Sequence, residues 1–115
     1  MGDHIDLIDD PNSDLAVDHA LPHSLVEDIL FEPVETAFGA VDRLIAWAEA
    51  QRLRLIDVLR EAGRSPFELL DDASVHTTTA GLNRAERRAD ALALFPSFAD
   101  ALAAGDISVG HVDRL

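Results

Sequence analysis

One stretch of the chain, from Pro33 to Gly63, constrains the fold more than any other. Its apolar residues recur at alternating intervals of three and four, interrupted at Arg52. Because an α-helix completes a turn about every 3.6 residues, this spacing places one apolar residue on the same face at each turn. The pattern predicts a long amphipathic helix that other helices must cover. The apolar stripe consists of Val34, Phe38, Val41, Ile45, Ala48, Leu55, Leu59 and Ala62.

Local signals mark both ends of this predicted helix. Pro33 stands before its first residue, where a missing N–H does no harm, and Gly63 follows its last apolar residue as a typical stop. We expect a helix from Val34 to Ala62, about 43 Å long at about 1.5 Å per residue. Gly39 costs about 1 kcal/mol relative to Ala inside a helix, so a start near Ala40 is the alternative.

Composition limits the possible classes of protein. The chain has 115 residues, of which 48% are hydrophobic, and it contains no cysteine. This is enough for one small domain, and it excludes disulfides and thiolate zinc sites. No run of about 18 apolar residues is present, and the first residues lack the basic segment of a secretory signal. We therefore expect a cytoplasmic protein without a membrane partner.

The charge is strongly negative and unevenly distributed. The formal net charge is −13, all nine basic residues are arginines, and the first of them is Arg43. This balance argues against a general polyanion binder, which needs a basic face. The early aspartates and scattered apolar residues predict a disordered acidic tail over residues 1–23. Residues 24–115 are then the helical domain.

Capping signals predict two short helices on either side of the long one. Ser24, with Glu27 three residues later, forms a capping box and predicts a helix over residues 25–31. Ser65 repeats the device, with Pro66 at the first helical position, and predicts a second short helix.

Further signals divide the C-terminal part of the chain. Residues 77–81 read as a break, and Asn83 opens a predicted helix that reaches Phe95. Pro96 is either a kink or the first turn of a new helix, which Gly105 closes. No strand pattern competes with these signals. The sequence therefore predicts an all-α protein, a small helical bundle built on one long helix.

The last predicted helix is unusually short. It begins after Ser108 and extends about two turns to Leu115, whereas an isolated helix needs about 12 residues to be even marginally stable. Val109, Val112 and Leu115 form an apolar edge with little chain left to cover it. We therefore expect a helical domain that is truncated at its C-terminus.

The sequence offers no convincing catalytic or metal-binding motif. Histidine is the residue type that titrates nearest neutral pH, but Pro22 separates His19 from His23, and no His-Glu-x-x-His pair occurs. Residues 10–14 lack the glycine and the bidentate glutamate that a calcium loop requires. No phosphate-binding glycine loop or Gly-x-Ser-x-Gly elbow is present. We expect neither catalysis nor a cofactor.

One basic cluster stands out, consisting of Arg84, Arg87 and Arg88 at a spacing that places them on one helix face. It is either a solvated face that pairs with nearby acids such as Glu86 and Asp90, or a set of phosphate contacts. Arg114 is a further candidate, within residues 101–115, where a helix, a glycine-containing turn and a capped helix have the outline of a helix-turn-helix. Such helical hairpins also occur in bundles that do not bind DNA.

The second half of the chain resembles a known family in two segments, GLNRAERRADALALFP at 81–96 and ALAAGDISVGHV at 101–112. Together they are similar to the domain of unknown function 222, which heads actinobacterial proteins of the 13E12 repeat type. The segment AEAQRLRL at 48–55 fits the opening of the same family. The resemblance covers about residues 34–115. A shorter likeness relates residues 105–111 to the helix-turn-helix of chromosome-partitioning proteins.

The family resemblance implies a helical domain that is usually followed by an HNH endonuclease domain. In that domain, histidine and asparagine side chains hold one metal ion and activate water against a phosphodiester. None of those catalytic positions matches a residue of this chain, so the resemblance transfers no catalytic residue and no metal site.

Three hypotheses for the function follow. The first is a non-catalytic helical module, the truncated front end of an HNH-nuclease-like protein, which packs through its helices, with the missing nuclease domain as a possible partner. The second is a DNA-binding module that uses Arg84, Arg87, Arg88 and Arg114. The third is a self-associating helical protein, because Arg52 resembles a polar interruption in a heptad-like stripe. The face expected to pack or interact consists of Phe38, Val41, Ile45, Leu55 and Leu59.

Overall fold

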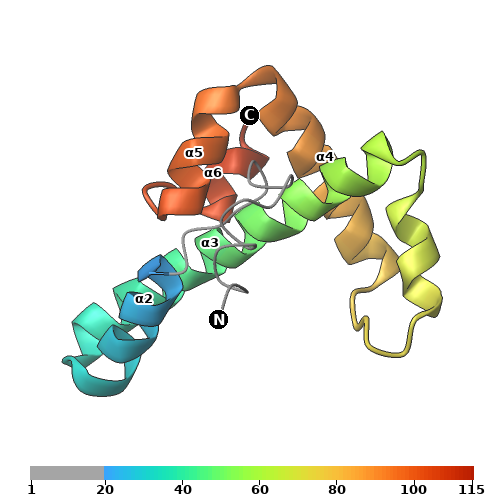
Figure 1. Ribbon diagram of the computed structural model, residues 1–115. Coiled ribbons are helices and arrows are strands. Elements are labelled where there is room, and N and C mark those ends of the chain that lie inside the picture. Colours follow the sequence, from blue (N-terminus) through green and yellow to red (C-terminus); the bar gives the residue numbers. More distant parts are fainter. Residues whose placement is uncertain (1–19) are drawn as a thin grey trace, which may run out of the picture.

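The computed structural model describes residues 20–115 and shows helices without strands over that range (Figure 1). The predicted all-α class is confirmed. The predicted disordered tail lies outside the described residues, except for residues 20–23, which are helical. The elements are α2 (Ala20–Phe31), α3 (Val34–Glu61), the 3-10 helix η2 (Pro66–Asp71), α4 (Thr79–Leu94), α5 (Pro96–Ala104) and α6 (Val109–Asp113).

Helix α3 is the predicted long helix, a continuous run of 28 residues that crosses the whole structure diagonally in Figure 1. It begins at Val34, directly after Pro33, and passes through Gly39 without a break. At its other end Gly63 has a φ of +72°, and the Arg64 N–H donates to the carbonyl oxygen of Leu59 at 2.9 Å. Such a left-handed glycine turn satisfies carbonyls that the helix leaves free. Both predicted ends are correct within one residue.

Helix α2 begins earlier than its capping box predicts. Its first residue is Ala20, so Ser24 and Glu27 lie inside the helix and do not mark its start. Pro22 also lies within the described helix. The start predicted at residue 25 is therefore too late.

The start of η2 follows its predicted cap. The Phe67 N–H donates to Ser65 Oγ at 3.2 Å, and the Ser65 N–H donates to Glu68 Oε2 at 3.3 Å. The capping box at Ser65 is therefore confirmed, although the element it opens is a 3-10 helix.

Helix α4 begins four residues before its predicted start. Thr78 Oγ1 accepts a hydrogen bond from the Gly81 N–H at 3.0 Å, so this threonine is the cap and Asn83 lies inside the helix. Pro96 opens α5 as a separate helix, which decides between the two alternatives for that position.

The turn between α5 and α6 fits tightly against α3. Gly105 ends α5 with a φ of +78°, as its position predicts. A Cβ atom at this position would lie 3.0 Å from Cβ of Arg43. Arg43 also donates from its guanidinium to the carbonyl oxygen of Ala104 at 3.5 Å. Glycine is therefore needed here both for the backbone conformation and for the close approach of α3.

The main core lies between the C-terminal half of α3 and the helices α4, α5 and α6. On α3 it uses a different face from the predicted stripe, because Ala46 and Ile56 follow the stripe members Ile45 and Leu55 by one residue and point about 100° away from them around the helix. The expectation that other helices cover the stripe is wrong for most of its length in the described part of the chain. The core residues are Ala46, Leu53, Ile56, Leu82, Ala85, Ala89, Leu92, Leu102 and Val112.

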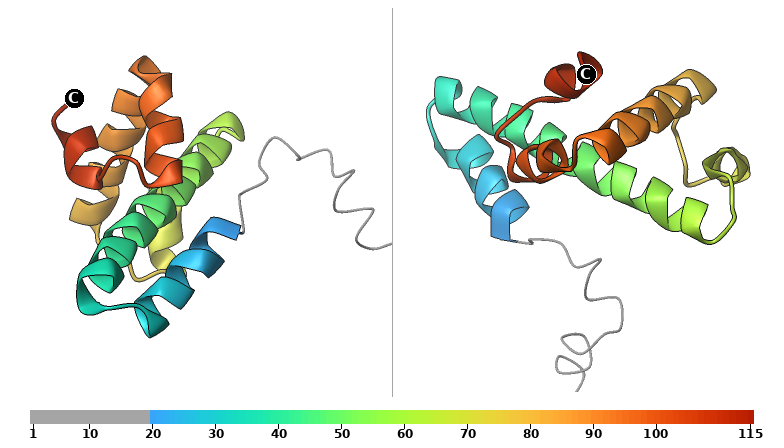
Figure 2. Two further views of the ribbon diagram at one scale, coloured as in Figure 1. Left: turned by 90° about the vertical axis from the view of Figure 1, so that its left-hand side faces the viewer. Right: turned by 90° about the horizontal axis from the view of Figure 1, so that it is seen from above.

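Helix α2 packs along the N-terminal half of α3 and forms a helical hairpin with it, which we call the hairpin (residues 20–45). Figure 2 shows that the hairpin lies at the opposite end of α3 from η2. Its buried residues, Leu25 and Ala40, are not part of the main core. Among the described residues, no helix has the length and apolar character required to span a membrane.

Candidate functional site

The predicted arginine cluster divides into one structural and two exposed members. Arg88 lies between two carboxylates, with one guanidinium nitrogen 3.0 Å from Glu49 Oε2. Its Nε and second terminal nitrogen donate to Asp113 at 2.6 and 2.9 Å. This two-pronged contact is the geometry that arginine forms best with a carboxylate. Arg88 therefore joins α3, α4 and α6 and is not available to a ligand.

The charges of this network compensate one another inside the fold. The Glu49 side chain is only 7% exposed, and Arg52 lies 3.5 Å from its other carboxylate oxygen. The hydrogen bond from Arg88 holds the pKa of Asp113 below its ordinary value, and Arg84 and Arg87 add to this effect through their positive charge. The hydrogen bond to Asp113 likewise raises the pKa of Arg88. A buried carboxylate of this kind is stable only while its partner remains.

Arg84 and Arg87 remain exposed. With Arg88, Ala91, Val112, Asp113 and Leu115 they line a shallow hollow of about 420 Å³. Arg114 is also exposed and follows the end of α6. The predicted solvent-side partners Glu86 and Asp90 instead contact Arg60 of α3, at 2.7 and 3.0 Å.

Helices α5 and α6 have the predicted helix-turn-helix outline, but α6 is short. His111 faces the start of its own helix, where its Nδ1 accepts from the Ser108 N–H at 3.0 Å. Asp113 is held by Arg88. The side chains of His111 and Asp113 are therefore engaged in contacts within the chain. DNA binding stays a prediction that rests on Arg84, Arg87 and Arg114.

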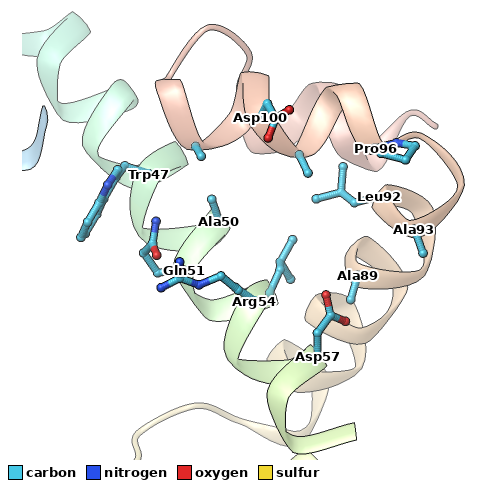
Figure 3. A pocket seen from close by; sticks show the side chains of 13 residues that line it. Trp47, Ala50, Gln51, Arg54, Asp57, Ala89, Leu92, Ala93, Pro96 and Asp100 are labelled. Atoms are coloured by element: carbon cyan, nitrogen blue, oxygen red, sulfur yellow. The ribbon is translucent and has the colours of Figure 1, made fainter. Parts of the chain in front are cut away.

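A second hollow, of about 490 Å³, lies between α3, α4 and α5 (Figure 3). Gln51, Arg54 and Asp57 of α3 and Asp100 of α5 supply its polar groups, whereas alanine and leucine side chains form much of the rest. The buried Oε1 atom of Gln51 has no hydrogen-bond partner among the described residues. No histidine lines the hollow. Across residues 20–115, no group of three or more His, Cys, Asp or Glu side chains could hold a metal ion.

The predicted interaction face is mostly exposed. Phe38, Ile45 and Leu55 are 71%, 52% and 59% exposed, Val41 is also exposed, and Leu59 is half-buried. On the hairpin, further exposed apolar side chains adjoin this face. We define the hairpin surface as Val26, Leu30, Val34, Phe38, Val41 and Ile45, all of which are exposed.

Both helices of the hairpin contribute to one side of it. On α2, Val26 and Leu30 follow the buried Leu25 by one and five residues. On α3, Val41 and Ile45 follow the buried Ala40 by the same intervals. These intervals correspond to rotations of about 100° and 140° about each helix. Because the two helices run antiparallel and face each other at their buried residues, equal rotations bring both pairs to the same side.

The sequence did not predict the partners of Arg88. The partners of Arg88, Glu49 and Asp113, lie 39 and 25 residues away in the sequence, beyond any local pattern. A weaker signal was present, because Ala46, Glu49, Leu53 and Ile56 form a second stripe at helical spacing with a carboxylate inside it.

Comparison with known protein families, with curated proteins and with solved structures finds no match to this chain. The resemblance to the domain of unknown function 222 therefore stays an expectation from the sequence.

Proposed function

We propose that this chain is a non-catalytic helical module that binds a protein partner through the hairpin surface. The observation that supports this most directly is the exposure of six apolar side chains on one side of the hairpin. Contiguous apolar surface on a protein marks an interaction site more often than scattered apolar residues do. The main core uses another face of α3, so these residues are free to serve a partner.

The energetics favour this assignment. Burying one Leu, Ile or Phe side chain completely contributes about 1.5–3 kcal/mol. Phe38 and Ile45 leave at least half of their surface in water, so half or more of that free energy is not used by the fold. A partner that covers them gains it on binding.

The sequence resemblance supports the same proposal. If the chain is related to the domain of unknown function 222, it corresponds to the helical part that accompanies an HNH endonuclease domain. Its role is then to pack against that domain or another protein. The metal-dependent chemistry lies outside the residues of this chain.

Photo-crosslinking tests the interaction. Benzoylphenylalanine at position 38, in the full chain expressed in its natural host, should give discrete crosslinked protein products. Ile45→Ser in the same chain should reduce these products. The matched control carries benzoylphenylalanine at position 94, since Leu94 is equally exposed and lies outside the hairpin. Identical products from both positions, or none from position 38, would contradict the proposal.

A cleavage assay tests the non-catalytic part of the proposal. The purified chain should leave supercoiled plasmid intact in the presence of Mg²⁺ or Mn²⁺. Metal-dependent nicking that a chelator abolishes would refute it.

DNA binding is the second candidate, supported by the exposed guanidinium groups of Arg84, Arg87 and Arg114. It predicts weak binding that falls steeply with salt, because each phosphate contact releases counterions. Fluorescence anisotropy on labelled duplex at low salt should then lose its signal in the Arg84→Ala/Arg87→Ala variant. Equal binding by both proteins excludes this candidate.

A further inference from the structure

We infer that the hairpin surface receives a basic amphipathic helix, a partner segment with apolar residues on one face and Lys or Arg along its edges. The inference rests on the proposed function, because it names the class of partner for the same surface. It follows from the charges that border the surface and from the length and shape of the surface itself.

Carboxylates border the hairpin surface along both helices. On α3, Glu35 and Asp42 each follow an apolar member of the surface by one residue and therefore point about 100° beyond it. On α2, Glu27 follows Val26 in the same way. All three carboxylates are exposed. The apolar surface is thus flanked by negative charge on its α2 side and on its α3 side.

Little positive charge offsets these carboxylates. The hairpin contains one arginine and no lysine, and the guanidinium of this Arg43 contacts the carbonyl oxygen of Ala104 at the end of α5. The guanidinium of Arg43 is therefore directed toward α5 and away from the hairpin surface. The acidic residues of the hairpin are Glu27, Asp28, Glu32, Glu35 and Asp42.

This potential disfavours three other occupants. Nucleic acids and anionic membranes carry negative charge and are repelled by an acidic border. A second copy of this chain would bring the same acidic borders together, and its net charge of −13 adds repulsion at longer range. A positively charged protein segment has the complementary potential.

The dimensions of the surface suit a helix. Val34 and Ile45, its end members on α3, are separated by eleven residues, or about 17 Å of helix axis. This length corresponds to about three helical turns. Two adjacent helices present a groove into which a third helix can place anchors at positions i, i+3 or i+4, and i+7.

Two designed peptides of about 15 residues test this inference. The first carries leucines on one helical face and arginines along both edges, and the second has glutamates in place of the arginines. We expect the arginine peptide to bind the full chain at least about tenfold more tightly in calorimetry. Its affinity should fall as salt is raised, because the contacts along the edges are solvent-exposed.

Matched variants show whether the binding uses the hairpin surface. Phe38→Ser should weaken binding of the arginine peptide at least about tenfold, whereas Leu94→Ser, outside the hairpin, should not. Glu35→Lys/Asp42→Lys should remove the preference for the arginine peptide. Glu61→Lys/Asp71→Lys makes the same change of charge away from the hairpin and should retain it.

The outcomes separate the inference from the proposed function. Equal binding of both peptides with loss on Phe38→Ser overturns the inference but leaves an interaction surface in place. The inference is also overturned if both charge-reversed variants weaken binding of the arginine peptide equally, or if Phe38→Ser leaves that binding unchanged. The inference is also overturned if light scattering shows a dimer that Phe38→Ser abolishes. Binding to anionic vesicles that Phe38→Ser abolishes would overturn it too. The proposed function itself fails in the crosslinking experiment at position 38.

Discussion

The hairpin and the C-terminal cluster, which consists of residues 46–115, use the same helix in different ways. In the hairpin, α3 buries the small Ala40 and leaves large apolar side chains such as Phe38 exposed. In the C-terminal cluster, α3 buries Leu53 and Ile56 together with Glu49. The two faces are offset around one continuous helix. The comparison indicates that the cluster supplies most of the stability, whereas the hairpin supplies a surface.

Ion pairs follow the same division. Arg88 connects Glu49 with Asp113, and Arg60 contacts Glu86 and Asp90, all within the cluster. In the hairpin, the long-range polar contact of Arg43 leads out of it toward α5. The cluster is therefore cross-linked by directional contacts as well as by apolar packing. Substitutions in the hairpin and in the cluster test this difference.

The largest expected effect compares two apolar truncations. Leu102→Ala should lower the free energy of unfolding by about 2–5 kcal/mol, because Leu102 is 0% exposed and its loss leaves a cavity. Phe38→Ala in the hairpin should change it by no more than about 0.5 kcal/mol. Denaturant unfolding measures both. Similar losses would show that the hairpin also depends on its apolar residues for stability.

The next effect tests the ion pairs of the cluster. Arg88→Met should cost about 2–3 kcal/mol, because Glu49 stays buried with only the more distant Arg52 beside it. Arg84→Met, on the same helix but exposed, should be nearly neutral. Adding Glu49→Gln to Arg88→Met should recover part of the loss in a double-mutant cycle. Strict additivity would mean that the two side chains are not coupled.

A backbone substitution in the cluster should have a moderate effect. Gly105→Ala should cost about 1–2 kcal/mol, since an L-residue is strained at a φ of +78° and the new methyl group would crowd Arg43. Gly110→Ala is the control, because its methyl group would find ordinary contact 3.5 Å from Ser108 Oγ. Thermal unfolding should separate the two variants clearly, and equal melting temperatures would contradict the prediction.

In the hairpin, a glycine substitution should stabilise. Gly39→Ala should add about 0.5–1 kcal/mol, because Gly39 lies inside α3 and a Cβ atom there meets nothing within 4 Å. If the hairpin opens independently of the cluster, slower hydrogen exchange should be confined to the hairpin amides. Equal slowing across α4 and α5 would show that the two regions open together.

The smallest effect is a dependence on pH. Arg88 lowers the pKa of Asp113 in the folded protein below that of the unfolded chain. The ionised Asp113 therefore stabilises the fold at pH values above its pKa in the unfolded chain. This contribution is lost as the pH falls through its lower pKa in the folded protein. It should stay under about 1 kcal/mol, because the Asp113 side chain is 42% exposed. Asp113→Asn should differ from the unmodified protein at pH 7 and converge with it in strong acid, as denaturant unfolding can show.

Local signals in the sequence were sufficient for the boundaries of α3. Pro33 and Gly63 act through their own backbone conformations, so their effect does not depend on distant residues. The start of α2 was misplaced because Ser24 and Glu27 have the spacing of a capping box and yet lie within a helix. The start of α4 was misplaced because two residues, Thr78 and Asn83, were both chemically able to cap it.

The core and the site depend on tertiary contacts that such signals do not contain. Periodicity identified the most hydrophobic stripe of α3, but burial went to the adjacent face, where Ala46 is small enough for close packing and Glu49 is neutralised by Arg88. The predicted interaction face belongs to this stripe and stays a prediction. The structure shows that residues such as Phe38 and Ile45 are exposed and are not part of the core. The arginine cluster was predicted as a single group. In the structure, Arg88 pairs with carboxylates of other helices, whereas the remaining two arginines are exposed.

The continuity of α3 has a mechanical consequence. The helix carries no proline between Val34 and Glu61 and spans about 42 Å, from the hairpin to η2. It therefore acts as a lever arm of fixed length. If a partner binds the hairpin as proposed, α3 keeps it at a set distance and angle from the exposed arginines of α4. Turning one end of the arm must turn the other.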